Sequence, residues 1–144
     1  MGVNRFEDLR VWQAAREQCN RVGALMKLPA FRDDRELATQ MNAASLSVMF
    51  NISEGFLRRR DKETSQFLRY AFASNGELKA GYYAAEGRSY TSHDETASLI
   101  ALNESIARML RRWEGTLDLR TKDQGRTKDQ GRTKHQAPST KDHE

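Results

Sequence analysis

The sequence SVMFNISEG, residues 47–55, places Ser, Asn and Glu beside an apolar stripe with helical spacing. About twenty residues later, SNGE at 74–77 repeats this arrangement. Polar groups are costly to bury unless they find partners, so a helix with several of them beside its apolar face uses them to fix its position against a neighbour. The two segments therefore predict helices that pack through a shared polar layer, within one chain or between subunits.

The same helical spacing extends in both directions along the chain and predicts four amphipathic helices. Apolar residues recur at steps of three and four, and no alternation typical of strands competes with them. Ser92 and Glu95 have the spacing of a capping box at the start of the last helix. Short connections between helices of this length favour an all-α, antiparallel up-down-up-down four-helix bundle over residues 1–119. The predicted helices span residues 8–27, 34–58, 62–87 and 93–118.

Residues 120–144 differ in composition from the rest of the chain. The hexapeptide RTKDQG at 120–125 repeats at 126–131, and Ala137 is the only apolar residue after Leu119. Because such a segment has nothing to bury, we predict a disordered low-complexity tail. Two interpretations of the tail remain open: an expanded repeat tolerated outside the fold, or a basic arm for nucleic acid.

The net charge of +4 is distributed unevenly. Residues 120–144 contain seven Lys and Arg against four Asp and Glu, which gives +3. Residues 1–119 contain 17 against 16, which gives +1. The total charge is therefore no argument that the folded body binds nucleic acid.

The sequence contains few signals that indicate cellular location. Cys19 is the only cysteine, which excludes an intrachain disulfide and fits a reducing compartment. No apolar run is long enough to span a membrane, and the first eight residues show no apolar signal-peptide core. We expect a cytoplasmic protein with no membrane association.

The sequence lacks the motifs of common enzyme sites. There is no Glu-x-x-His pair, zinc-ligand spacing, Gly-rich phosphate loop or nucleophile elbow. His93 falls at a helix cap, and Cys19 falls on the apolar face of the first helix. We therefore expect no enzymatic activity, no cofactor and no metal.

The predicted polar layer admits two interpretations. It is either a hydrogen-bonded layer that sets helix register or a subunit interface, or a pair of carboxylates that binds or acts on a ligand. In an antiparallel bundle the two glutamates lie roughly 18 Å apart along the axis, at about 1.5 Å per residue, which favours the structural interpretation. The layer consists of Ser47, Asn51, Glu54, Ser74 and Glu77.

Arginines gather at the end of the bundle where the second turn meets the end of the fourth helix. They are candidates for contacts with phosphates. Alternatively, they complement helix dipoles and keep the surface soluble. The candidate nucleic-acid-binding residues are Arg58, Arg59, Arg60, Arg108, Arg111 and Arg112.

Several segments of the sequence resemble those of a known protein family. The chain resembles the bacterial four-helix-bundle family of 23S ribosomal RNA intervening-sequence proteins, which is related to accessory variability proteins of diversity-generating retroelements. The resemblance covers roughly residues 5–117 and rests on FEDLRVW at 6–12, NISEG at 51–55 and the later Ser-x-x-Glu at 74–77. Where family members often carry a basic pair, this sequence has Asn42-Ala43.

The resemblance implies a ring-like homopentamer, an association with structured RNA or with a reverse transcriptase, and no enzymatic activity. The expected function is a non-enzymatic oligomeric scaffold that binds structured RNA or hybrid nucleic acid, RNA or DNA, as an accessory to a reverse transcriptase. The alternative is a protein–protein interaction module without nucleic-acid binding. Salt-dependent RNA binding separates the two.

Overall fold

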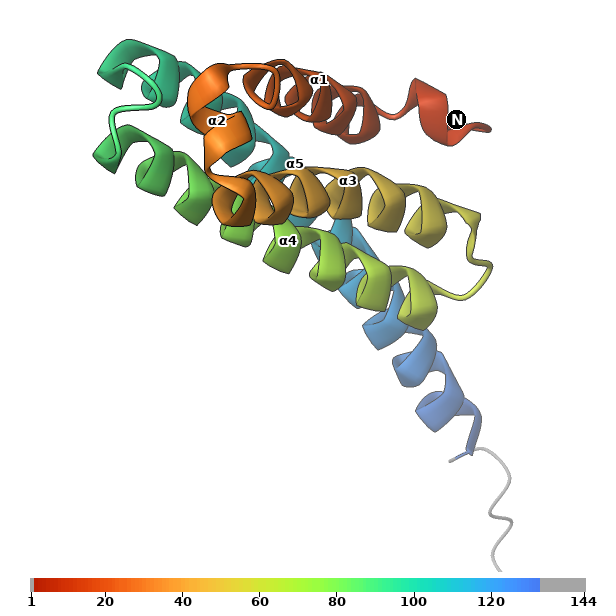
Figure 1. The fold of residues 1–144 in the computed structure, drawn as a ribbon. Coiled ribbons are helices and arrows are strands. Elements are labelled where there is room, and N and C mark those ends of the chain that lie inside the picture. Colours follow the sequence, from red (N-terminus) through yellow and green to blue (C-terminus); the bar gives the residue numbers. More distant parts are fainter. Residues whose placement is uncertain (1, 133–144) are drawn as a thin grey trace, which may run out of the picture.

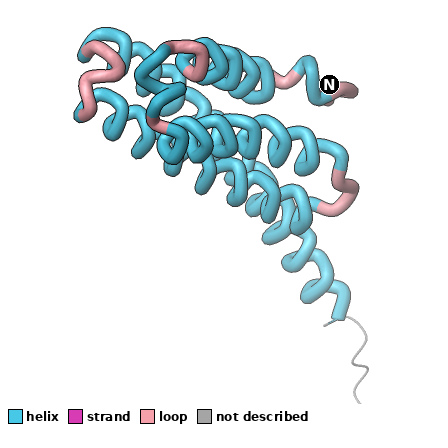
Figure 2. The backbone as a smooth tube through the Cα atoms, viewed as in Figure 1, coloured by secondary structure: helices cyan, strands magenta, loops and turns pink. Residues whose placement is uncertain are grey.

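The computed structural model describes residues 2–132, which form helices and loops with no strand among them. Four long helices account for most of the described chain, as Figure 1 shows, and Figure 2 shows that short loops connect them. The elements are a 3-10 turn η1 (Phe6–Asp8), α1 (Arg10–Leu25), α2 (Pro29–Asp33), α3 (Arg35–Leu57), α4 (Asp61–Gly87) and α5 (His93–Arg132).

The short helix α2 is an element that the apolar spacing did not predict, because five residues carry too few periodic positions. Pro29 opens the helix, where its missing N–H leaves no hydrogen bond unmade. Phe31 is fully buried and its ring centroid lies 5.4 Å from that of Tyr90. This one aromatic side chain anchors the connection between α1 and α3 to the core.

The last helix continues beyond the predicted end near residue 118. α5 runs to Arg132, so the helix continues through residues 120–132 of the segment that was predicted to be a disordered tail; residues 133–144 lie outside the described part. Extending an existing helix requires no new nucleation, and the Thr121 hydroxyl donates to the Leu117 carbonyl 3.0 Å away. Side chains at 118–127 are exposed, so burial ends near the predicted boundary although the helix does not.

The long helices pack around two apolar clusters. α3 contacts α4, α4 contacts α5, and α1 contacts both α3 and α5 (Figure 1). One cluster surrounds Trp12, Ile52 and Leu110, and Trp12 Nε1 also donates to Ser53 Oγ at 2.9 Å. The second cluster surrounds Phe31 and includes Met41, Leu78, Tyr82 and Leu99. The core is therefore divided along its length, and polar residues occupy the level between its two halves.

Two glycines of α4 have opposite surroundings. A Cβ added to Gly81 would lie 2.7 Å from Met41 Cγ, whereas a Cβ at Gly76 would meet no atom within 4 Å. Met41 is buried, so it has little room to move. Gly81 therefore permits a close approach of α3 to α4, and Gly76 does not serve that purpose.

Alanine at the two glycines should change stability in opposite directions. Gly76→Ala is expected to raise the free energy of unfolding by up to about 1 kcal/mol, because glycine is a poor helix former. Gly81→Ala brings the same gain in helix propensity but overpacks the contact with Met41, which costs about 1–3 kcal/mol of stability. The free energy of unfolding should therefore fall. Urea unfolding followed by circular dichroism measures both. Equal stabilisation by the two variants would show that the close approach at Gly81 is unimportant.

Candidate nucleic-acid interface

Three residues of the predicted polar layer meet between α3 and α4. The hydroxyls of Ser47 and Ser74 are hydrogen-bonded at 2.7 Å across the two helices. Asn51 Nδ2 donates to the Ser47 carbonyl at 2.8 Å and to Ser47 Oγ at 3.0 Å. All three side chains are half-buried. Within one chain, this group ties α3 to α4 at one level.

The two glutamates assigned to the same layer lie outside it. Both are exposed, and Glu54 accepts a hydrogen bond from Arg58 Nη2 at 3.1 Å. Glu54 follows Ser47 by seven residues, which places it about 10 Å further along α3, toward the α3–α4 turn. Glu77 follows Ser74 by three residues, about 4–5 Å further along α4. The structure therefore brings the two serines and the asparagine together and leaves Glu54 and Glu77 on the surface.

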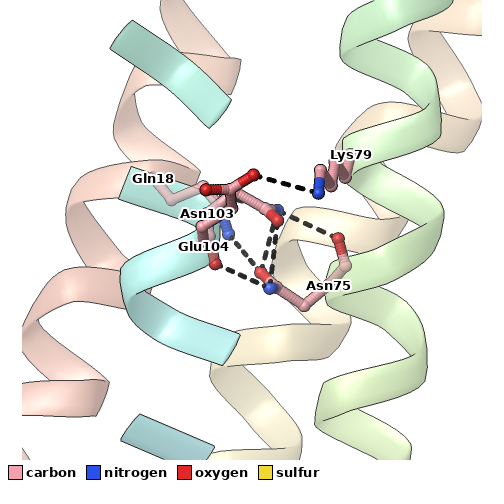
Figure 3. A network of polar contacts seen from close by, with 5 residues as sticks. All are labelled: Gln18, Asn75, Lys79, Asn103 and Glu104. Carbon is pink, nitrogen blue, oxygen red and sulfur yellow. Dashed lines mark hydrogen bonds and ion pairs between the residues drawn. The ribbon is translucent and has the colours of Figure 1, made fainter. Parts of the chain in front are cut away.

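A second polar layer, which sequence reasoning missed, is fully buried. Figure 3 shows its three amide side chains, Gln18, Asn75 and Asn103, pointing toward one another. Gln18 Nε2 donates to Asn75 Oδ1 at 3.1 Å, and Asn103 Nδ2 donates to Gln18 Oε1 at 3.0 Å. Asn75 Nδ2 donates to Asn103 Oδ1 at 3.2 Å. Three amide side chains from α1, α4 and α5 thus form one closed network.

The surroundings of this network complete its hydrogen bonding. Tyr82 donates through its hydroxyl to Gln18 Oε1 at 3.3 Å, and burial raises the pKa of that hydroxyl. No buried side-chain polar atom of the described residues lacks a partner. At the surface beside the network, Lys79 Nζ and Glu104 Oε1 form an ion pair at 3.1 Å (Figure 3). A network with every group satisfied serves structure, because it offers no group to a ligand.

One signal in the sequence pointed to this network. Asn75 lies between buried Ala71 and Leu78, and Asn103 lies between buried Leu99 and Ile106, each in the position of a core residue. An amide at a core position of a helix requires a partner. The spacing does not say which helices supply it.

The arginines of the α3–α4 connection form the first candidate patch, here called the turn patch and consisting of Arg58, Arg59 and Arg60. All three are exposed and precede the first residue of α4. The Arg58 guanidinium lies 4.7 Å from the centroid of the Phe67 ring, a cation–π distance, and also pairs with Glu54. The turn is therefore held in place by contacts of its own first arginine.

The other candidates form a separate patch on α5, here called the α5 patch and consisting of Arg108, Arg111 and Arg112. They are exposed, and the Arg111 guanidinium lies 4.8 Å from the Phe72 ring centroid. Arg120, rather than Arg111, lies beside Asp61 at the start of α4, with 3.9 Å between Nε and Oδ2. At about 1.5 Å per residue, the α5 patch is displaced by more than about 10 Å along α5 from the level of the turn patch.

The six arginines were predicted to share one end of the bundle, and the structure separates them into two groups along the body. Arg120, which marks the level of the turn on α5, lies only two residues beyond the predicted end of the fourth helix. The arginines at 108–112 precede Arg120 by eight or more residues and therefore lie further back along the body. The structure offers two basic patches at different heights.

A structural cluster around Asp34 lies where α2 and α3 meet the α4–α5 connection. The backbone N–H of Leu37 donates to Asp34 Oδ1 at 3.2 Å, Tyr90 donates to Oδ2 at 2.9 Å, and Arg88 pairs with the same carboxylate. The bond from Leu37, with those from Tyr90 and Arg88, lowers the pKa of Asp34. The cluster caps α3 and joins it to the α4–α5 connection.

Residues with catalytic or metal-binding chemistry are dispersed in the described part of the chain. His93 Nδ1 lies 2.9 Å from Glu86 Oε1, which raises the pKa of His93, and Cys19 Sγ accepts from Ser45 Oγ at 3.7 Å. Among residues 2–132, no three His, Cys, Asp or Glu side chains gather in a way that holds a metal ion. None of the helices in that range is long and apolar enough to cross a membrane.

A family model described as "23S rRNA-intervening sequence protein" matches residues 7–112. That range begins in η1, covers α1 to α4 and ends in α5 at Arg112, before the hexapeptide repeat. No curated protein matches the chain at a significant level.

Proposed function

Because the chain belongs to the 23S rRNA-intervening sequence protein family, we propose that it is a non-enzymatic oligomeric scaffold that binds structured RNA or an RNA–DNA hybrid. The turn patch carries this proposal. Three consecutive arginines project from a connection whose position is held by the contacts of Arg58 with Phe67 and Glu54. Arginines held in place lose less conformational entropy when they contact phosphates.

The proposal includes an antiparallel up-down-up-down arrangement of the four long helices. It is supported by the order of contacts along the chain. Between α3 and α4, Ser47 meets Ser74 near the middle, and the Gly55 carbonyl accepts from Thr64 Oγ1 near the turn. Between α1 and α5, Gln18 meets Asn103, and the later Arg21 meets the earlier Ser98. In this arrangement the turn patch lies at one end of the body.

The proposal also includes self-association as a homo-oligomer, with a pentameric ring as the expected form. Phe50 and Leu57 share the outer face of α3 and are 58% and 62% exposed. Tyr83, on the face of α4 that carries Lys79, is 54% exposed. A closed ring requires two different complementary faces on each subunit, and these two sites supply apolar surface on different helices.

The biological setting of the proposal follows from the family. An accessory role beside a reverse transcriptase, by the relation to diversity-generating retroelements, requires binding to RNA or to an RNA–DNA hybrid. A cytoplasmic location is supported by the single cysteine. Repetition of the two patches around an oligomer would raise affinity by multivalency, because one body carries little net charge.

Replacing the turn patch separates binding by the body from binding by the tail. Arg58→Gln, Arg59→Gln and Arg60→Gln together should weaken RNA binding and reduce the slope of log affinity against log salt by about 2–3, because fewer counterions are released. Fragment 1–119, which lacks the repeat, should retain most of its affinity. Electrophoretic shift titrations at two salt concentrations measure both changes.

A matched control removes the same charge at the other end of the body. Lys27→Gln, Arg32→Gln and Arg35→Gln are exposed changes far from the turn patch and should alter RNA binding less. If the truncation abolishes binding and the Arg58–Arg60 variant does not weaken it, the tail is the site. Absence of binding by the full chain at low salt would remove the nucleic-acid proposal.

One observation favours a second candidate function. The exposed apolar residues Phe50 and Leu57 form a strip on α3 that a different protein, rather than a second copy of this chain, could cover. The protein is then an interaction module without nucleic-acid binding. It would remain monomeric alone and show no salt-dependent affinity for RNA.

A further inference from the structure

A recess lies beside the α3–α4 turn and contains both basic and aromatic groups. It combines charge that attracts phosphates with a ring that can contact a base. A carboxylate and an amide also line it, and these can accept from and donate to the edge of a base. The lining residues are Arg58, Arg60, Lys62, Glu63, Gln66 and Phe67.

An exposed aromatic side chain continues this surface along α4. Tyr70 follows Phe67 by three residues and Gln66 by four, which places all three on one side of the helix. The rings of Phe67 and Tyr70 meet edge to face, with centroids 6.0 Å apart, and Tyr70 is 50% exposed. Arg58 stacks on Phe67. Arg58, Phe67 and Tyr70 are thus neighbours on this surface, with Phe67 in contact with both of the others.

We propose that this recess, extended by Tyr70, binds an unpaired segment of nucleic acid. Bases stack on Tyr70 and on the Arg58–Phe67 pair, and the connecting phosphates contact Arg60 and Lys62. The inference rests on the proposed RNA binding and narrows it to unpaired nucleotides. In a duplex the faces of the bases are covered by their neighbours, so aromatic side chains can stack only on unpaired bases.

The net positive charge of the recess is small, so attraction of phosphates alone would bind a nucleic acid weakly there. This favours an additional contribution from stacking on bases. Glu63 lies in the recess, and Glu54 pairs with Arg58, so two carboxylates offset part of the charge of three basic residues. The α5 patch differs, because Phe72 packs against the core and Arg111 lies over its ring. Contacts of the α5 patch are therefore with the phosphate backbone, whereas the recess distinguishes unpaired from paired strands.

The test compares two substitutions of Tyr70 in the full chain. The probes are a fluorescein-labelled oligouridine of about 12 nucleotides and an RNA duplex of similar length, a size that suits one stacking site. Tyr70→Leu should weaken oligouridine binding by about 5- to 100-fold, and duplex binding by less than about 3-fold. Tyr70→Phe keeps the ring and should bind both probes as the unchanged protein does. Fluorescence anisotropy measures the affinities.

A second variant keeps the inference open to refutation if Tyr70→Leu disturbs folding or assembly. Arg60→Gln with Lys62→Gln changes two exposed side chains and should lower the salt slope for oligouridine by about 1.4. Lys27→Gln with Arg32→Gln is its charge-matched control and should leave the slope unchanged.

The outcomes separate this inference from the proposed function. If the protein binds RNA but Tyr70→Leu weakens both probes equally, or neither, the recess does not recognise unpaired bases and the general proposal stands. An unchanged salt slope in the Arg60 and Lys62 variant likewise overturns the inference. If the unchanged protein binds neither probe at low salt, the proposed function fails, and the inference with it.

Discussion

Asn75→Leu is expected to lower the free energy of unfolding by about 2–4 kcal/mol, because it leaves buried amide groups of two neighbours short of partners. Gln18 Nε2 loses its acceptor, and Asn103 Oδ1 loses its donor. For a chain of this size, the melting temperature should fall by about 5–15 °C. Thermal and urea unfolding followed by circular dichroism measure the change, with an unchanged urea m-value as the sign that the unfolded state is unaffected.

Removing the whole network should lower the free energy of unfolding by less than the sum of the losses caused by the single substitutions. The variant combines Gln18→Leu, Asn75→Leu, Asn103→Leu and Tyr82→Phe, which leaves none of the four side chains with an unsatisfied polar group. Changes in one hydrogen-bonded network are not additive, so the combined loss should fall well below the summed losses. Ser47→Ala, in the half-buried layer, is a control and should cost about 1 kcal/mol. Additive losses would mean that the four residues contribute independently.

Phe50→Glu with Leu57→Glu is expected to convert the assembled protein to a monomer of 16.5 kDa and to weaken RNA binding by about 100- to 10,000-fold. The two side chains share the outer face of α3, and two buried carboxylates there would oppose any apolar contact with a neighbouring subunit. Loss of the oligomer removes simultaneous contacts by several basic patches. Light scattering reports the mass, and anisotropy with a labelled RNA hairpin reports the affinity.

The control for this experiment is Leu28→Glu. Leu28 is 42% exposed and precedes α2, away from the outer face of α3, so the variant should remain assembled. If the unchanged protein is a monomer at micromolar concentration, the assembly proposal is wrong and the avidity argument goes with it. If the double variant stays assembled, the outer face of α3 is not the interface.

The long helices were predictable because their signals are local. The predicted bounds of the first three agree with α1, α3 and α4 to within two residues, and the start of the fourth agrees with α5. The end of α5 was not predictable in the same way. The repeat after Leu119 has no apolar residue to bury, yet a helix that has already formed can continue without burial.

The candidate site was predicted in its residue types more than in its geometry. The segment at 47–55 identified Ser47 and Asn51 as polar residues of a helix seam, and in the structure Ser47 is hydrogen-bonded to both Asn51 and Ser74. Glu54 was assigned to the same layer because spacings of three and four residues both count as one helical face. That spacing gives neither the depth of a side chain nor its level along the seam. Glu54 lies about two turns nearer the α3–α4 turn than Ser47, where it is exposed and pairs with Arg58.

By itself, the sequence determined where the long helices lie and which side chains each one directs toward a neighbour. That information is carried by the repeat of 3.6 residues, which depends only on nearby residues. Only the tertiary structure decided which polar groups meet. Gln18 and Asn75 are 57 residues apart, and Asn75 and Asn103 are 28 apart, yet they share one level. The axial shift of each helix against the next sets that level, and it also separates the turn patch from the α5 patch. Because this shift results from the packing of whole helix faces, no short stretch of sequence encodes it.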